Sequence, residues 1–266
     1  MTTTASGSRP TLGGRPATAP AQRLSSVLRA EWTKLTTLRS LWITPLIGVL
    51  ITVGIGYAVN DAYGATDSSL TEDPSVGIYY GLNFGQVAAA CFGILLIGQE
   101  YNSGTIRSSL TAVPARGRLF GAKLLLGGGI GLLAGLLSTA GAYLAAGANV
   151  NLALDSPATV RSIVAGVLYH PLLVIVCLGA TAMLRNLTAA MGLLSPLVFL
   201  GSTVLVAVPG VKEVAQFLPD RAGQYALRHQ DTAGIHYGHW TGLLIMALWA
   251  AAAAYGGLRS LRRHDA

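Results

Sequence analysis

The sequence predicts an all-α, polytopic membrane protein with six transmembrane helices and an N-terminal amphipathic helix at the membrane interface. Three observations support this fold class. Hydrophobic residues make up 52% of the chain and charged residues only 11%, whereas a soluble domain has about 25% charged residues. The apolar residues form long continuous runs instead of alternating with polar residues, which favours helices over a β-barrel. The basic residues, finally, gather in alternate connecting segments.

Six apolar segments are long enough to cross a bilayer, whose hydrocarbon core of about 30 Å needs about 20 residues of helix. They are residues 41–59, 79–99, 119–146, 162–184, 189–208 and 240–258, within a transmembrane domain expected over residues 41–260. Residues 1–20 are rich in Thr, Ser, Gly, Pro and Ala, which predicts a disordered tail. The first apolar run begins too far along the chain to be the core of a cleavable signal peptide.

The distribution of lysine and arginine predicts the orientation of the spans. With an even number of spans both termini share one side, and that side holds 14 of the 18 basic residues, which leaves 4 on the other. The positive-inside rule therefore places both termini in the cytoplasm. On this arrangement residues 100–118 form a cytoplasmic loop and residues 209–239 an outer loop. The net charge of +7 then reflects membrane topology and does not indicate a nucleic-acid partner.

A basic amphipathic helix is expected over residues 21–40, lying at the cytoplasmic lipid headgroups. Its apolar stripe consists of Leu24, Val27, Leu28, Trp32, Leu35 and Leu38. Glu31 falls near the centre of this stripe, where a carboxylate that faced lipid would be costly. Two partners for Glu31 are left open, namely Lys34 in the same helix or a group elsewhere in the fold.

The polar segment between the second and third spans is predicted to contain a short helix. Asn102 or Ser103 could cap the start of this helix, and Pro114 could stop it. Its narrow apolar stripe is formed by Ile106, Leu110 and Val113. In a cytoplasmic loop such a stripe has no lipid to face, so we expect it to dock in a groove of a partner protein. The alternative is a plain loop with some helical propensity.

The third span contains several glycines at short intervals. Gly127, Gly131 and Gly135 lie four residues apart, which predicts a smooth face for close helix packing. Gly129, Gly131 and Ala134 also match a G-x-G-x-x-A dinucleotide fingerprint. That match is weak, because no strand precedes it and the apolar run continues on both sides.

Histidines supply the few candidates for chemistry. His170, near the outer end of the fourth span, is a functional candidate because an ionisable group in a membrane is costly. A neutral histidine bonded to a neighbour is the commoner situation. His229, His236 and His239 cluster in the last outer loop, but no span offers matching ligands, so no metal site is expected.

Two further observations limit the classes of function that the chain can have. The chain has no G-x-x-x-x-G-K-[ST] segment, so it is not expected to hold a nucleotide in a P-loop of its own. Cys91 and Cys177 both lie in apolar runs, which indicates buried thiols and neither a disulfide framework nor a metal site.

Three segments make the chain resemble the permease subunits of ABC-2 type ABC transporters. They are RAEWTKLTTLRS before the first span, GQEYNSGTIRSSLTAVPARGRLFGAK after the second and FLPDRAGQYAL before the sixth. The resemblance covers nearly all of residues 22–264. The second segment is the most specific, because it carries an E…GT…P…R…K pattern. The residues that match this pattern are Glu100, Gly104, Thr105, Pro114, Arg116 and Lys123.

The resemblance implies a function and several partners. In this family six spans form half of a transporter in the bacterial plasma membrane, with both termini in the cytoplasm. The first amphipathic helix, here with Glu31, Trp32 and Lys34, corresponds to the connecting helix. The loop after the second span holds a coupling helix that contacts a separate ATPase subunit. The residues expected to take part in coupling are Glu100, Gly104, Thr105, Ile106, Leu110, Val113, Pro114 and Arg116.

The chain is therefore expected to be the membrane subunit of an ATP-driven exporter and not itself an enzyme. ATP and Mg²⁺ are expected on the partner ATPase, and a second copy or a similar permease would complete the transporter. The sequence does not identify the substrate. Two alternatives stay open: a non-transporting assembly or regulatory subunit, and a membrane-embedded enzyme. A co-purifying P-loop ATPase would separate the first reading from both.

Overall fold

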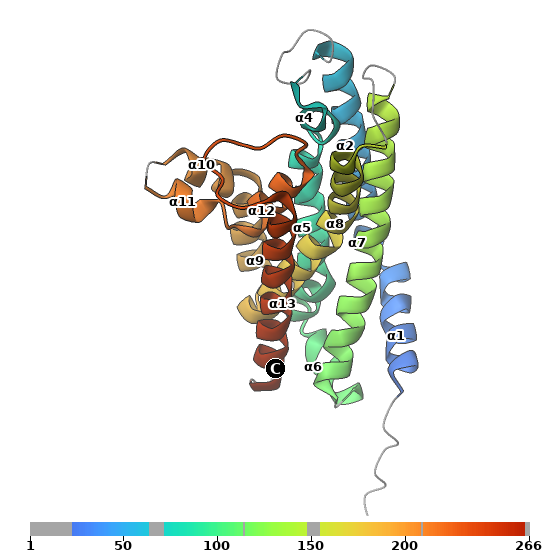
Figure 1. Ribbon diagram of the computed structural model, residues 1–266. Helices are drawn as coiled ribbons and strands as arrows, with labels where there is room; N and C mark the ends of the chain where they lie inside the picture. The colour runs from blue at the N-terminus through green and yellow to red at the C-terminus, as the bar shows by residue number, and fades with distance from the viewer. Residues whose placement is uncertain (1–22, 64–71, 114, 148–154, 209, 264–266) are drawn as a thin grey trace, which may run out of the picture.

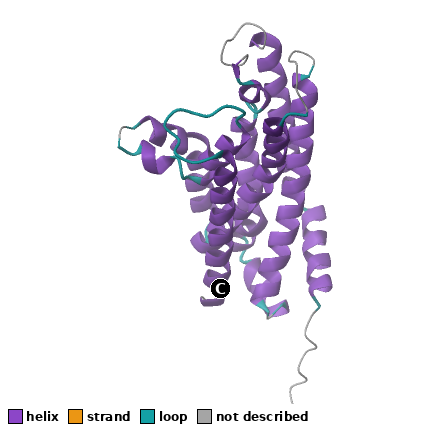
Figure 2. Cartoon of the chain, viewed as in Figure 1, coloured by secondary structure: helices purple, strands orange, loops and turns teal. Residues whose placement is uncertain are grey.

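The computed structural model describes residues 23–63, 72–113, 115–147, 155–208 and 210–263. Within these ranges the chain consists of helices and their connections, with no strand (Figures 1 and 2). The all-α class predicted from the continuous apolar runs is therefore confirmed. The expected tail over residues 1–20 lies outside the described residues.

Five helices are long and apolar enough to cross a membrane, as expected of a multi-pass membrane protein. They are α2 (Arg39–Tyr63), α5 (Leu82–Asn102), α7 (Arg116–Ala146), α8 (Pro157–Leu184) and α13 (His239–Arg263). Each contains most of a predicted span and extends a few residues beyond at least one of its ends. The longest of the five, α7, runs along most of the length of the bundle (Figure 1).

The centre of the bundle is formed by α5 and α8. In their most apolar stretches 61% of the residues are buried, against 17% in α2 and 28% in α13, which therefore lie at the periphery. Helix α8 packs against α5, α7 and α13. Among its core side chains, Tyr169, Leu173 and Leu178 are fully buried. The exposed leucines of α2, α7 and α13 form the apolar outer surface that a lipid environment requires.

The predicted fifth span is helical but irregular. It consists of α9 (Leu187–Pro196), a π-helical turn η1 (Leu197–Gly201) and α10 (Ser202–Ala207), which follow one another directly. A π turn widens the helix and shifts its hydrogen bonding. The buried amide of Gln86 in α5 compensates, because its Nε2 donates to the carbonyl oxygen of Val198 at 3.3 Å. The apolar helix here is shorter than the five long ones.

The first helix, α1 (Leu24–Thr37), packs beside the lower part of α7 and runs roughly parallel to it (Figure 1). The helix therefore runs along the bundle and not across it (Figure 1). Val27 and Leu35 are buried, whereas Trp32 is 44% exposed and packs edge-to-face on Trp42. The buried face of α1 is thus narrower than the predicted apolar stripe, because it does not include Trp32. Trp32 follows Glu31 by one residue, which turns it about 100° away from the buried row.

Short helices complete the fold. Helix α4 (Pro74–Ile78) lies at one end of the bundle, and α6 (Thr105–Ala112) lies at the opposite end (Figure 1). The predicted outer loop contains α11 (Lys212–Ala215) and α12 (Pro219–Leu227), and α12 packs against α8 and α13.

The glycine face of α7 lies in its interface with α5 and α8. A Cβ atom at Gly127 would lie 2.6 Å from Leu96, and one at Gly131 would lie 2.9 Å from the backbone of Pro171. At Gly135 it would lie 2.4 Å from the carbonyl oxygen of Val167. Only glycine permits so close an approach, so these residues set the distance between α7 and α8.

Candidate functional site

A buried cluster of two acids and two bases joins three helices near α6. Lys123 of α7 is 3% exposed, and its Nζ lies 2.6 Å from Oε2 of Glu31 in α1. The same Nζ lies 2.9 Å from Oε1 of Glu100, near the end of α5, and donates to the carbonyl oxygen of Leu96 at 3.1 Å. Glu31 and Glu100 are themselves 5% and 8% exposed. Glu31, Glu100 and Lys123 are thus shielded from water, and their contacts with one another take the place of hydration.

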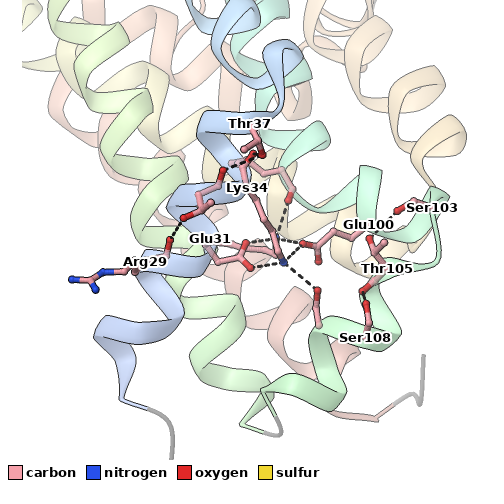
Figure 3. A network of polar contacts seen from close by, with 12 residues as sticks. Arg29, Glu31, Lys34, Thr37, Glu100, Ser103, Thr105 and Ser108 are labelled. Atoms are coloured by element: carbon pink, nitrogen blue, oxygen red, sulfur yellow. Dashed lines mark hydrogen bonds and ion pairs between the residues drawn. The ribbon is translucent and has the colours of Figure 1, made fainter.

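Lys34 closes the cluster on its accessible side. Its Nζ lies 2.7 Å from Oε1 of Glu31 and 2.8 Å from Oε1 of Glu100 (Figure 3). It also lies 3.1 Å from Oγ of Ser109 in α6. Both partners considered for Glu31 are thus present, because Lys34 pairs with it locally and Lys123 pairs with it across 92 residues of sequence.

The charges within the cluster balance. Two carboxylates face two ammonium groups, so the buried site has no net charge, which is the condition for tolerating ions away from water. Burial lowers the pKa of Lys34, but the hydrogen bonds and charges of Glu100 and Glu31 outweigh this, and the pKa lies above its usual value. Lys34 therefore stays positively charged at neutral pH.

An open groove of about 610 Å³ runs beside the cluster, between α1, α5 and α6. Its lining includes the apolar side chains of Leu35, Leu38 and Leu95. The polar lining residues include Glu31, Lys34, Gln99, Glu100, Asn102, Ser103, Thr105, Ser108, Ser109 and Lys123. Lys34 lies between the buried cluster and the solvent, since its side chain is 41% exposed. The groove connects the buried charges to the surface near α6.

The start of α6 differs from the sequence prediction. Neither Asn102 nor Ser103 caps the helix, because both belong to the end of α5. The N-cap is Gly104, with φ of +71°, a left-handed conformation that glycine adopts without strain. The sharp turn at Gly104 lets α6 begin with only two residues, Ser103 and Gly104, between it and α5. Pro114, predicted to stop the helix, lies outside the described residues.

The apolar stripe of α6 faces the inside of the protein. Ile106 is 4% exposed and Val113 is 9% exposed, and Leu110 is half-buried. Val113 packs in a small core with Val27 of α1 and Leu119 of α7. The prediction that this stripe would dock in a partner's groove is therefore wrong. Val27 and Leu28 of α1 pack with Val113 and Leu110, which removes these side chains from water.

The face of α6 that remains free is polar. Its exposed residues are Thr105, Arg107, Ser108, Thr111 and Ala112. The hydroxyl groups of Ser108 and Thr111 donate to backbone oxygens within α6, so these short side chains lie close to the helix backbone. Arg107 provides a charge on this face. Any partner that contacts α6 meets these residues and not the apolar stripe.

Arg116 takes a different place from the other predicted coupling residues. Its Nη1 donates to the carbonyl oxygen of Leu261 at 2.7 Å. Because Leu261 lies in the last turns of α13, this bond joins the start of α7 to the end of α13. The bond also satisfies a carbonyl near a helix C-terminus, where an arginine is electrostatically favourable.

A second polar cluster, not predicted from sequence, lies at the opposite end of the bundle. Asp73 caps α4 and also accepts from the backbone amides of His229 at 3.4 Å and Gln230 at 3.2 Å. Nε2 of His229 lies 3.1 Å from Oγ of Ser162, at the start of α8. Ser162 is fully buried, and Asp73 contacts the backbone of His229 and not its ring. This is a structural clasp and does not have the geometry of a serine nucleophile with its base.

The remaining histidines are separated in space. His170 is 2% exposed and packs at right angles to Tyr169 in the bundle interior. His239 stacks on Tyr225 with ring centroids 4.4 Å apart, and His236 is exposed. Among the described residues, no group of three or more His, Cys, Asp or Glu side chains is arranged to hold a metal ion.

Comparison with models of known protein families finds no match, and no curated protein is found to be similar to the chain. The resemblance to ABC-2 permeases therefore rests on the sequence segments themselves. Of the residues in the E…GT…P…R…K pattern, the structure brings Glu100 and Lys123 into direct contact. Gly104 and Thr105 follow shortly after Glu100 in the chain, at the turn into α6.

Proposed function

We propose that the chain is the membrane-spanning permease subunit of an ATP-driven exporter of ABC-2 type. In this proposal a separate ATPase subunit binds ATP and Mg²⁺ and contacts α6. The chain itself binds no nucleotide, which agrees with the lack of a P-loop in its sequence.

The observation that carries the proposal is the connection between α6 and the bundle. Lys34 bonds to Ser109 of α6 and, at the same time, to Glu31 of α1 and Glu100 of α5. Through Lys123 the same carboxylates hold α7. A displacement of α6 by a partner would therefore act on three helices together, which is what coupling of ATP hydrolysis to a transmembrane movement requires.

The proposal also assigns a membrane arrangement. The segment α9–η1–α10 is counted as the fifth of six crossings, since residues 187–207 together reach about 30 Å at 1.5 Å per residue. The end of the bundle with α6 then faces the cytoplasm with both termini, as the positive-inside rule predicts. A second copy or a similar permease faces this chain across the transport pathway in a bacterial plasma membrane.

The exposed face of α6 is the proposed contact with the ATPase. It is small and polar, with Arg107, Ser108 and Thr111 at its centre. A contact of this size is expected to concentrate its binding energy in few residues. The buried stripe of α6 contributes indirectly, because it fixes the helix against α1 and α7.

Co-purification from the native host tests the proposal. The chain, tagged at its C-terminus, is isolated in mild detergent, and bound proteins are identified by mass spectrometry. A P-loop ATPase in comparable amount is the expected result. The Arg107→Glu, Ser108→Trp variant should lose it, whereas Arg263→Glu, which reverses an exposed charge at the same end of the bundle, should retain it. If wild type brings down no P-loop ATPase, the proposal fails.

A further inference from the structure

A small cavity lined by basic side chains lies where α11, α12 and residues 228–238 meet. Its volume is about 150 Å³, several times the roughly 30 Å³ that one water molecule occupies. The basic residues in its wall are Lys212, Arg221 and Arg228, and no acidic side chain is among the described residues that line it. The polar neutral residues include Gln224, Tyr225 and Tyr237.

The gathering of these bases runs against the charge distribution of the chain. Only 4 of the 18 basic residues fall in segments predicted on the outer side, and three of them line this one cavity. The fourth, Arg161, donates from Nη2 to the carbonyl oxygen of Arg228 at 2.5 Å. Arg161 therefore holds the backbone at the end of α12, from which the side chain of Arg228 extends.

The electrostatics of the cavity favour an anion. Like charges brought together in a partly enclosed space repel one another, and the repulsion weakens when a counter-charge enters. Three acids occur nearby, namely Glu213, Asp220 and Asp231, but none of them lines the cavity. Asp231 instead accepts a hydrogen bond from Tyr225 and faces His239.

Contacts within the chain hold the cavity open. The hydroxyl group of Tyr237 donates to the carbonyl oxygen of Gln216 at 2.6 Å, and its ring packs edge-to-face on Tyr225. Gly234 has φ of +85°, and a Cβ atom there would lie 2.9 Å from Nζ of Lys212. The turn at Gly234 thus brings the loop close to the ammonium group of Lys212. A preformed cavity lowers the ordering cost of binding.

Apolar side chains lie next to the basic cavity along the chain. Val211, Val214 and Phe217 flank Lys212 and Gln216 and are 37%, 72% and 44% exposed. An apolar surface beside a cationic site is the combination that a phospholipid fits, with its phosphate at the bases and its chains along the apolar residues.

We propose that this cavity binds a phosphate-type anionic group, with Lys212 and Arg228 as its ligands. The group can be supplied by an anionic lipid headgroup or by a soluble phosphate compound, and the adjoining apolar residues favour the lipid. The site is independent of whether the chain is a transporter. It also gives the outer-side bases a role that membrane topology alone does not provide.

Binding of labelled lipids to the full-length protein in neutral detergent tests the site. Fluorescent phosphatidylglycerol is expected to bind more tightly than fluorescent phosphatidylcholine, and added salt should weaken only the former. If inorganic phosphate or glycerol 3-phosphate competes with the lipid, the site also binds a soluble anion. If neither competes, the site binds the lipid alone. Equal affinity for the two lipids, without phosphate competition, would overturn the proposal.

Charge-neutralising variants locate the binding. Lys212→Gln and Arg228→Gln are each expected to weaken phosphatidylglycerol binding about fivefold, since each removes one base from the anion. Arg259→Gln, which removes an exposed charge from α13 at the other end of the bundle, is the matched control. Lys212 lies exposed in a four-residue helix, so its substitution leaves the fold intact. If Lys212→Gln and Arg228→Gln bind like Arg259→Gln, the cavity is not the site.

Discussion

Nζ of Lys123 and Oε2 of Glu31 lie 2.6 Å apart, although 92 residues separate them in the sequence. Both side chains are buried, and the pair joins α7 to the helix that precedes the first long apolar helix. The acid in the middle of an apolar stripe is thus explained by a base near the start of the apolar helix α7. Each would be costly alone, and together they fix the position of α1.

The first prediction concerns this pair. Lys123→Met leaves Glu31 without its buried partner, and such a loss typically costs about 3–5 kcal/mol. The double variant Glu31→Leu, Lys123→Met leaves Lys34 with Glu100 and should recover most of that loss. Thermal unfolding of the detergent-solubilised protein measures both. If the double variant is as unstable as the sum of the two single variants, the pair is not energetically coupled.

The second prediction concerns the glycine face of α7. Gly135→Ala places a methyl group 2.4 Å from the carbonyl oxygen of Val167, so α7 and α8 must separate, at a cost of about 1–3 kcal/mol. Gly129→Ala, six residues earlier in the same helix, meets nothing within 4 Å and should be neutral or slightly stabilising. Unfolding midpoints that are lowered equally by both changes would refute the role of Gly135 in close packing.

The third prediction is a pH dependence at the clasp of Asp73, Ser162 and His229. Burial lowers the pKa of His229; Asp73 opposes this shift, while Arg161 and His239 add to it. The unfolded chain therefore takes up the proton first. Stability from the clasp is complete above about pH 6.5 and is lost as the pH falls below that value. His229→Gln should flatten the stability profile between pH 7 and pH 5, and an unchanged profile would contradict the assignment.

The fourth prediction concerns orientation. In a background without Cys91 and Cys177, a cysteine at Asp231 should react with an impermeant thiol reagent added to intact cells, because this side chain is 89% exposed at the predicted outer side. A cysteine at Ser108, exposed on α6, should react only after lysis. Reaction of Ser108→Cys in intact cells would invert the topology.

The helices themselves follow closely from the sequence. Each of the five long helices covers a predicted span, because a continuous apolar run of about 20 residues has few other ways to satisfy its backbone in a membrane. Local signals were less reliable at the connections. At the start of α6 the N-cap is Gly104 and neither Asn102 nor Ser103, because the turn there is left-handed, a conformation that glycine adopts without strain.

The candidate site depends on tertiary contacts that a sequence pattern does not specify. Ile106 and Val113 are buried and Leu110 is half-buried, as expected for one face, but the sequence does not say what covers a face. An unpaired apolar stripe can meet a partner or another part of the same chain, and tertiary packing decides between them. From the sequence Lys123 is only a motif residue, since a single lysine inside a predicted span carries no signal of the two carboxylates around it.

In the proposed function, a P-loop ATPase contacts the exposed face of α6. Site-specific photocrosslinking measures this most directly, with a photoreactive amino acid at Thr111 in living cells and, as control, at Leu144, which is 80% exposed in α7. Mass spectrometry of the adducts is expected to identify a P-loop ATPase from Thr111 and none from Leu144. If Thr111 yields no such adduct, or yields the same adducts as Leu144, α6 is not the contact with an ATPase.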